Sequence, residues 1–310
     1  KKKERMKIYT LLLGALFVSP TQAQTMHDWE NHHVLQINRE PARAAFTPFS
    51  VQKGDGSISL DGTWKFRWTP VPNERVVNFY QTNFNDKDWT DFPVPANWEV
   101  NGYGTPIYVS AGYPFKIDPP RVMGEPKTDY TTYKERNPVG QYRRTFVLPA
   151  GWEANGQTFL RFEGVMSAFY VWINGKRVGY SQGSMEPSEF NVTKYLKSGE
   201  NQISLEVYRY SDGSYLEDQD FWRFGGIHRS IHLIHTPDIH VRDYAIRTLP
   251  ASAGDYEDFI LQIDPQFSVY RGMTGKGYVL QGVLKDASGK EVATLKGNVE
   301  DILDLEHKAS

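Results

Sequence analysis

The sequence has no cysteine among its 310 residues. This absence excludes disulfides, thiol nucleophiles and cysteine-ligated zinc, so any chemistry must use carboxylates, histidines, hydroxyls or oxygen-ligated ions. An excess of charge of one sign is lacking too, because 35 basic and 37 acidic side chains leave a formal net charge of −2. Proteins that bind nucleic acid concentrate basic charge in a patch, so we expect no nucleic-acid partner.

Long hydrophobic runs are also scarce. The clearest one, IYTLLLGALFV at residues 8–18, follows several basic residues and precedes the small residues Thr21 and Ala23. This order is typical of a secretory signal peptide, and the run is too short to span a bilayer as a mature helix. We therefore predict a signal peptide over residues 1–23, a bacterial periplasmic or secreted location, and no membrane association once it is removed. Met6 is a candidate for the true start of the chain.

Sustained helical periodicity is absent after this segment, and short alternating stretches take its place. LDGTWKFRW, from Leu60 to Trp68, alternates large apolar residues with polar ones, which is the two-residue period of a half-buried strand. Asn174 and Gly175 separate two further alternating runs and predict a type I′ hairpin. Many short strands without a β-α-β rhythm predict an all-β fold, a jelly-roll sandwich over residues 59–236.

The domain division follows from these patterns. Residues 24–58 are predicted to form an extended N-terminal segment, and Pro237 marks the end of the jelly roll. Alternation resumes after Pro237 and suits an immunoglobulin-like sandwich over residues 237–310. Such a sandwich needs about 100 residues and about seven strands. We therefore expect this second domain to be incomplete and the chain to be a fragment.

One loop, DGSYLEDQDFWRFGGIHR at residues 212–229, combines acidic residues with aromatic ones. Acidic groups at close range raise each other's pKa, so they need separation by cations, solvent or other partners. Three interpretations are open: a calcium loop, although the EF-hand spacing is absent; a solvated turn; or the polar edge of a sugar site. The acidic residues concerned are Asp212, Glu217, Asp218 and Asp220.

Several segments carry a resemblance to a known family. YLEDQDFWRFGGIHRSIHL resembles the segment that ends the N-terminal jelly roll of glycoside hydrolase family 2, and its E-D-Q-D-x-W-R core is similar to the β-galactosidase branch. VPANWEVNGYGTPIYV, NPVGQYRRTFVLP and FEGVMSAFYVWINGKRVGYSQGSMEPSEFNVTKYLKSGEN occur in the order and spacing of that branch, from about Leu60 to Pro237. The shorter GIHR is shared with β-glucuronidases of the same family.

The resemblance implies roles for particular residues. Asp220 matches an aspartate that reaches into the active site and contacts a galactosyl hydroxyl and a monovalent cation. Phe221, Trp222 and Arg223 would anchor that loop against the catalytic domain. Ser110 stands where the best-known members have an asparagine that contacts the sugar and the magnesium shell, and a shorter side chain without an amide puts that contact in doubt. Na⁺ and Mg²⁺ are thus implied for the full-length enzyme, with most ligands downstream.

Catalysis needs residues that this chain does not supply. Retaining glycoside hydrolysis uses two carboxylates about 5–5.5 Å apart, and in family 2 both lie on a TIM barrel, whose alternating pattern is not seen here. We interpret the chain as the N-terminal part of a secreted β-galactosidase-like retaining hydrolase, inactive alone. Its expected partners are a β-galactoside, the missing barrel and further copies in a homo-oligomer. The alternatives are a non-catalytic carbohydrate-binding module and a family 2 β-glucuronidase or β-mannosidase.

The histidines offer weaker candidates. The histidines near the N-terminus could form a metal-binding tail or be solvated side chains. The later histidines are interpreted as packing residues rather than metal ligands. Asn191 begins a glycosylation sequon in form. The two histidine groups are His27, His32 and His33, then His228, His232, His235 and His240.

Overall fold

The computed structural model describes residues 26–44, 56–125, 134–254 and 256–303. Almost all regular structure in these ranges is β-strand, apart from short 3-10 helices and a helical turn at residues 299–303. The all-β prediction is therefore confirmed, whereas the predicted signal peptide lies outside the described residues. Within the described ranges, no helix is both long and apolar enough to cross a membrane. The 3-10 helices are η1 (Asp28–Glu30), η2 (Pro72–Glu74), η3 (Glu99–Asn101), η4 (Thr193–Tyr195) and η5 (Asp212–Tyr215).

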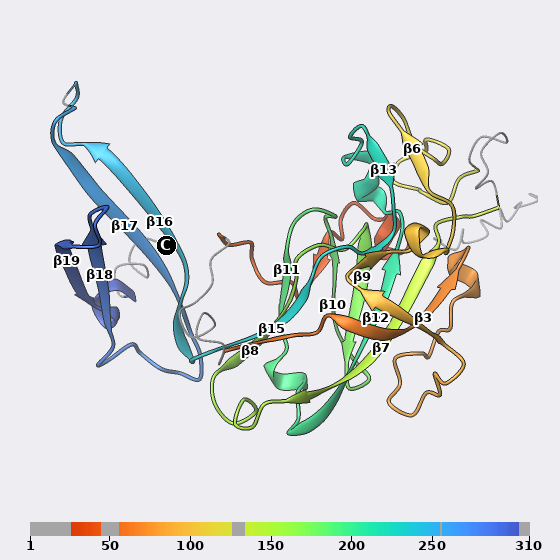
Figure 1. The fold of residues 1–310 in the computed structure, drawn as a ribbon, viewed down its shortest axis with the longest axis horizontal. Helices are drawn as coiled ribbons and strands as arrows, with labels where there is room; N and C mark the ends of the chain where they lie inside the picture. The colour runs from red at the N-terminus through yellow and green to blue at the C-terminus, as the bar shows by residue number, and fades with distance from the viewer. Residues whose placement is uncertain (1–25, 45–55, 126–133, 255, 304–310) are drawn as a thin grey trace, which may run out of the picture.

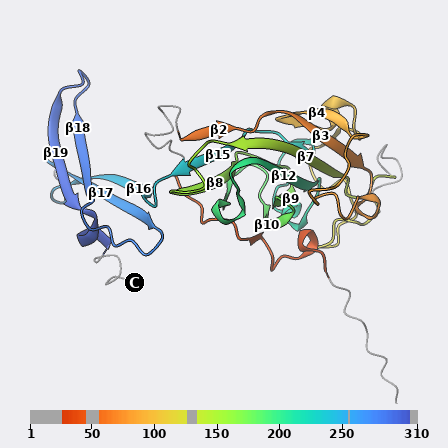
Figure 2. The same cartoon turned by 90° about the horizontal axis from the view of Figure 1, so that it is seen from below.

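Two antiparallel sheets form the larger part of the molecule (Figures 1 and 2). The seven-stranded sheet has the order β1 (Gln36–Ile37), β10 (Lys176–Gln182), β9 (Ala168–Ile173), β12 (Gly199–Tyr208), β7 (Val139–Leu148), β3 (Gly62–Thr69) and β4 (Thr90–Val94). The four-stranded sheet has the order β11 (Ser188–Asn191), β8 (Gln157–Phe162), β15 (Ile231–Thr236) and β2 (Ser57–Ser59). Strands far apart in sequence are thus neighbours in each sheet.

Apolar residues fill the space between the sheets because their side chains alternate along each strand. Trp64 and Phe66 of β3 are 1% exposed, and they share one buried cluster with Leu160 of β8 and Leu233 of β15. The hairpin that joins β9 to β10 turns at Asn174 and Gly175, whose φ angles of 49° and 77° are both positive. The predicted hairpin is therefore confirmed.

The N-terminal segment runs over the outer face of the seven-stranded sheet. η1 inserts Trp29, which is 3% exposed, into a second aromatic cluster on that face. β1 then pairs with β10, and Glu30 accepts hydrogen bonds from the backbone N–H groups of Val122 and Met123. The segment is therefore held by side chains and by strand pairing.

A short ribbon projects at one end of the sandwich, where β6 (Ile107–Val109) pairs with β13 (Phe221–Arg223) (Figure 1). Beside it, β5 (Ala96–Asn97) pairs with β14 (Gly226–Ile227). Both ribbons join the Pro- and Gly-rich region near residue 100 to the acidic loop, so this end of the fold positions the predicted site.

After β15 the chain leaves the jelly roll and forms two separate hairpins. β16 (Ile239–Pro250) pairs with β17 (Phe259–Val269), and β18 (Val279–Lys285) pairs with β19 (Glu291–Asn298). These strands stand apart from the sandwich in both views (Figures 1 and 2). The immunoglobulin-like assignment and the domain boundaries stay predictions.

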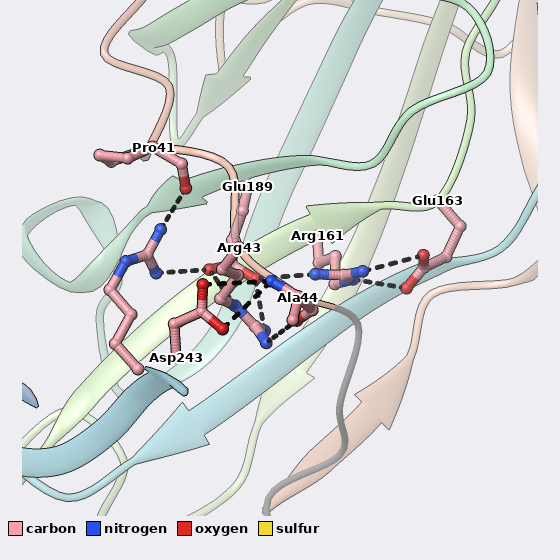
Figure 3. A network of polar contacts seen from close by, with 8 residues as sticks. Pro41, Arg43, Ala44, Arg161, Glu163, Glu189 and Asp243 are labelled. Carbon is pink, nitrogen blue, oxygen red and sulfur yellow. Dashed lines mark hydrogen bonds and ion pairs between the residues drawn. The ribbon is translucent and has the colours of Figure 1, made fainter. Parts of the chain in front are cut away.

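A polar network joins the N-terminal segment, the jelly roll and the base of β16 (Figure 3). The Glu189 carboxylate lies 2.9 Å from Arg43, 3.4 Å from Arg161 and 3.2 Å from Arg242. Burial raises the pKa of Glu189, but the arginines outweigh burial and the net pKa is lowered. Asp243 adds a second link, because it accepts a hydrogen bond from the Ala44 N–H at 3.3 Å.

Candidate functional site

The β6–β13 ribbon brings Asp220 and Ser110 together. Phe221 pairs with Val109 in an antiparallel register, so the next pair of positions is Asp220 opposite Ser110. Both side chains belong to exposed residues. Two exposed residues that are far apart in the sequence therefore directly flank the last paired position of the ribbon.

Tyr108 completes this arrangement, and sequence reasoning missed it. Its hydroxyl donates a hydrogen bond to the Asp220 carboxylate from the neighbouring strand of the ribbon. That hydrogen bond raises the pKa of Tyr108, because the carboxylate favours the protonated phenol. Tyr108 could have been found only by knowing the β6–β13 register.

The acidic residues of the loop do not share one surface. Asp212 accepts a hydrogen bond from Gln182 at 2.6 Å, Glu217 accepts one from the Ser184 hydroxyl at 2.6 Å, and Asp218 pairs with a guanidinium. Glu217 and Asp218 each have a specific partner within the fold, although Asp218 stays exposed to solvent. Among the described residues, no group of three or more ionisable side chains could hold a metal ion.

The three residues after Asp220 lie in different environments. Arg223 is 8% exposed and holds the loop, because it pairs with Asp218 at 2.6 Å and donates to the Glu217 carbonyl at 2.8 Å. Its guanidinium also lies 4.5 Å from the Phe221 ring. Trp222 points outward, is 48% exposed, and contacts the ring of Tyr108 edge-on. Arg223 and Phe221 therefore hold the loop against the rest of the jelly roll, whereas about half of the Trp222 side chain stays exposed to solvent.

Behind the loop, Gly225 fits a space that a larger residue would overfill. Its N–H donates to the Glu99 carboxylate at 3.0 Å, and a Cβ placed on it would lie 2.4 Å from the Trp98 ring. Glu99 pairs with Arg209 at 3.1 Å, and both side chains are 1% exposed. Burial raises the pKa of Glu99, and Arg209 opposes that rise. This buried pair fixes the backbone on which the loop returns to the sandwich.

Among the described residues, the cations that the resemblance implies find two candidate ligands. Asp220 offers a carboxylate oxygen besides the one bound to Tyr108, and Ser110 offers a hydroxyl. This donor set falls short of the six or more oxygens that cations of this kind usually take. The described residues do not build a cation site by themselves.

The later histidines follow the packing interpretation where the structure gives them contacts, whereas His27, His32 and His33 are exposed. His235 stacks on Trp152 at 4.7 Å, and the His240 ring bonds to the Pro237 carbonyl at 2.9 Å. Both ring nitrogens of His228 are buried without a hydrogen-bond partner, and burial lowers its pKa to about 4. His32 and His33 lie against each other at 4.0 Å. No metal cluster forms around any of them in the described part of the chain.

Comparison with known proteins decides the family. The profile described as "Glycosyl hydrolases family 2, sugar binding domain" matches residues 58–237. The chain belongs to glycoside hydrolase family 2. It is 37% identical over 296 residues to a β-galactosidase of Priestia megaterium, covering 91% of this chain, and 41% identical over 238 residues to a β-galactosidase of Yersinia pestis, covering 74% of this chain. These matches confirm the predicted resemblance of this family 2 chain to the β-galactosidase branch.

The chain spans 27% of the Priestia protein and 21% of the Yersinia protein. Among solved structures, a β-glucuronidase from an uncultured Clostridium species aligns with a TM-score of 0.58 at 20% identity, covering 84% of this chain and 40% of that one. A calcium-binding mutant of Bacteroides uniformis β-glucuronidase 2 aligns with a TM-score of 0.57 at 22% identity, covering 78% and 26%. At this identity the likeness is one of fold, and it confirms the family 2 jelly roll.

Proposed function

We propose that this family 2 chain is the N-terminal part of a retaining β-galactosidase-like hydrolase, and that Asp220 completes an active site whose catalytic glutamates lie in a barrel outside the chain. The observation that carries this proposal is the exposed Asp220 carboxylate. It accepts a hydrogen bond from Tyr108 at the end of a projecting ribbon, where Ser110 flanks the neighbouring strand. The identity to two β-galactosidases supports a terminal β-D-galactosyl residue as the group bound.

The chemistry divides between this domain and the barrel. A carboxylate accepts hydrogen bonds from sugar hydroxyls, so Asp220 would bind and orient the galactosyl ring. One barrel glutamate would protonate the leaving oxygen, and the other would attack the anomeric carbon to form a glycosyl-enzyme that water then hydrolyses. Asp220 would hold the galactosyl ring in the orientation that these steps need, and such orientation lowers the activation barrier substantially. The chain alone would bind without hydrolysing.

The ribbon also offers a surface for the barrel. Trp222 and Tyr108 are 48% and 52% exposed, and they lie against each other on the face that carries Asp220. Exposed aromatic pairs of this kind are typical of interface anchors. We propose that they pack against the missing barrel in the full-length protein, which would be periplasmic or secreted and would assemble as a homo-oligomer.

Hydrolysis of three nitrophenyl glycosides tests the proposal. The coding DNA is read beyond Ser310, and the full-length protein is assayed with the β-D-galactoside, the β-D-glucuronide and the β-D-mannoside. We expect galactoside hydrolysis by the full-length protein and none by residues 1–310. Preference for the glucuronide or mannoside would overturn the substrate assignment. A stop codon after Ser310 would overturn the assignment as part of a hydrolase and would favour a non-catalytic carbohydrate-binding module.

A further inference from the structure

Arg209 lies at the base of the β6–β13 ribbon, directly after the end of β12. Its side chain is 1% exposed. One terminal nitrogen of its guanidinium, Nη2, donates to the Thr105 carbonyl at 2.8 Å and to the Arg223 carbonyl at 2.6 Å. Thr105 lies two residues before β6, and Arg223 is the last residue of β13. A single buried side chain therefore binds both segments of the chain where the ribbon meets the jelly roll.

The other two nitrogens of the Arg209 guanidinium face carboxylates. Nε lies 3.1 Å from Glu99, and Nη1 donates to Glu135 at 3.3 Å. Glu99 in turn accepts a hydrogen bond from the N–H of Gly225, two residues beyond β13. Glu135 accepts one from the Thr105 hydroxyl at 3.4 Å. Each carboxylate therefore connects Arg209 a second time to one of the two segments that form the ribbon.

The two carboxylates of this cluster are costly to bury. Burial raises the pKa of both Glu99 and Glu135, and the opposing effect of Arg209 is smaller. A raised pKa means that the folded state disfavours the ionised carboxylate, so burial of these charges costs more than their pairing returns. Ionic groups buried at such a cost are expected where one geometry has to be held for function.

The ribbon is too short to hold its own direction. It has three paired positions between Ile107 and Val109, and Asp220 lies next to the last of them. A two-stranded ribbon by itself is marginally stable in water. The direction of the ribbon, and with it the position of Asp220, therefore depends on what its base contacts, and Arg209 supplies four of those contacts.

We propose that Arg209 is a positioning residue for the proposed galactoside hydrolysis, because it sets the direction of the ribbon and so the place where Asp220 meets the sugar. This role rests on the proposed function, since it needs a barrel that supplies the catalytic glutamates. Arg209 itself is too deeply buried to contact a substrate. Lysine cannot replace it, because an ammonium group lacks the planar fork of donors that reaches two carbonyls and two carboxylates together.

Kinetics of four full-length enzymes with a nitrophenyl β-D-galactoside test this role: the unaltered protein, Arg209→Lys, Asp220→Ala and the double variant. Arg209→Lys releases the base of the ribbon, and misplacement of a binding group by about 1 Å can cost about 100-fold in rate. We expect kcat/KM to fall by about tenfold in Arg209→Lys. The same change in the Asp220→Ala enzyme should lower kcat/KM by less than about twofold, because the group that Arg209 positions is already gone.

Arg143→Lys is the matched control, because Arg143 is another buried arginine of the same sheet. Its side chain binds Asp86 at 2.8 Å and backbone carbonyls within residues 79–84 instead of the ribbon. We expect both lysine variants to lower the thermal midpoint, and only Arg209→Lys to lower kcat/KM. Glu99→Gln takes the place of Arg209→Lys if that variant does not fold, since its amide oxygen still accepts from Gly225 while the charge that faces Arg209 is lost.

The outcomes separate this role from the proposed function. Equal fold-losses with and without Asp220, or unchanged kcat/KM in the folded variant at position 209 or 99, would overturn the positioning role and leave the proposed function standing. A loss of kcat/KM in Arg143→Lys as large as that in the ribbon variant would also overturn the role. Near-normal kcat/KM in Asp220→Ala would overturn both the role and the proposed function.

Discussion

The Tyr108 hydroxyl donates a hydrogen bond to the Asp220 carboxylate across the β6–β13 ribbon. The two residues are 112 positions apart in the sequence. An exposed aspartate on a loop can adopt several rotamers, and a hydrogen bond from a ring with few torsions restricts them. Tyr108 is therefore a positioning residue for the carboxylate that we assign to sugar binding.

Tyr108→Phe should weaken this positioning without unfolding the domain. The variant keeps the ring contact with Trp222 and loses only the hydroxyl. We expect kcat/KM of the full-length enzyme for a nitrophenyl β-galactoside to fall by about three- to tenfold, as for one hydrogen bond. Tyr256→Phe, at a tyrosine that is 79% exposed, is the control. Equal kcat/KM for Tyr108→Phe and the unaltered enzyme would refute the role of the hydroxyl.

Gly225→Ala should destabilise the domain. The added methyl group would lie 2.4 Å from the ring of Trp98, which is fully buried and cannot move freely. Overpacking of this kind costs about 1–3 kcal/mol in the free energy of unfolding. Gly282→Ala is the control, because the atoms nearest to its added methyl group would lie 3.8 Å away. Urea denaturation measures the stability of both variants. A denaturation midpoint for Gly225→Ala as high as that of Gly282→Ala would contradict the prediction.

Glu189→Ala should be costly because it leaves three arginines around an empty position. The Glu189 side chain is 8% exposed, and Arg43 and Arg161 are 9% exposed. Removing one partner of a buried ion pair typically costs about 3–5 kcal/mol. Asp264→Ala breaks the exposed pair with Arg247 and should cost about 0–1 kcal/mol. Equal losses for the two variants in urea denaturation would contradict the prediction.

His228 should make stability depend on pH. Burial lowers its pKa in the folded state to about 4, below the ordinary value of 6.5. Between these values the unfolded chain binds a proton that the folded chain does not, so the free energy of unfolding falls as the pH drops from 6.5 towards 4. We expect His228→Phe to lose less stability over this range than the unaltered chain. His32→Phe is the control, and equal slopes for His228→Phe and the unaltered chain would count against the assignment.

Local features of the fold could be predicted from the sequence. The alternation around Trp64 and the Asn174-Gly175 turn depend on neighbouring residues, and both have the predicted structure. The importance of Asp220 was implied by a resemblance that spans the jelly roll, and its role stays a prediction. The Ser110 prediction likewise stays untested, although the ribbon does place Ser110 opposite Asp220.

Long-range pairings could not be predicted. β6 is only three residues long and lies in a segment rich in proline and glycine, so no periodicity marks it as the partner of β13. The hydrogen bond between Ser184 and Glu217 could not be predicted either, because Ser184 comes from another loop. Arg209 and Glu99 form their buried pair across 110 positions, and nothing local in either stretch indicates it.

The effect of Asp220→Ala in the full-length enzyme tests the central claim most directly. A hydrogen bond to a charged group is worth about 1.5–3 kcal/mol, so we expect galactoside turnover to fall by about 10- to 100-fold while the thermal midpoint stays unchanged. Glu291→Ala, at an exposed acidic residue of β19, should leave both unchanged. Near-normal turnover by a folded Asp220→Ala enzyme would contradict the account.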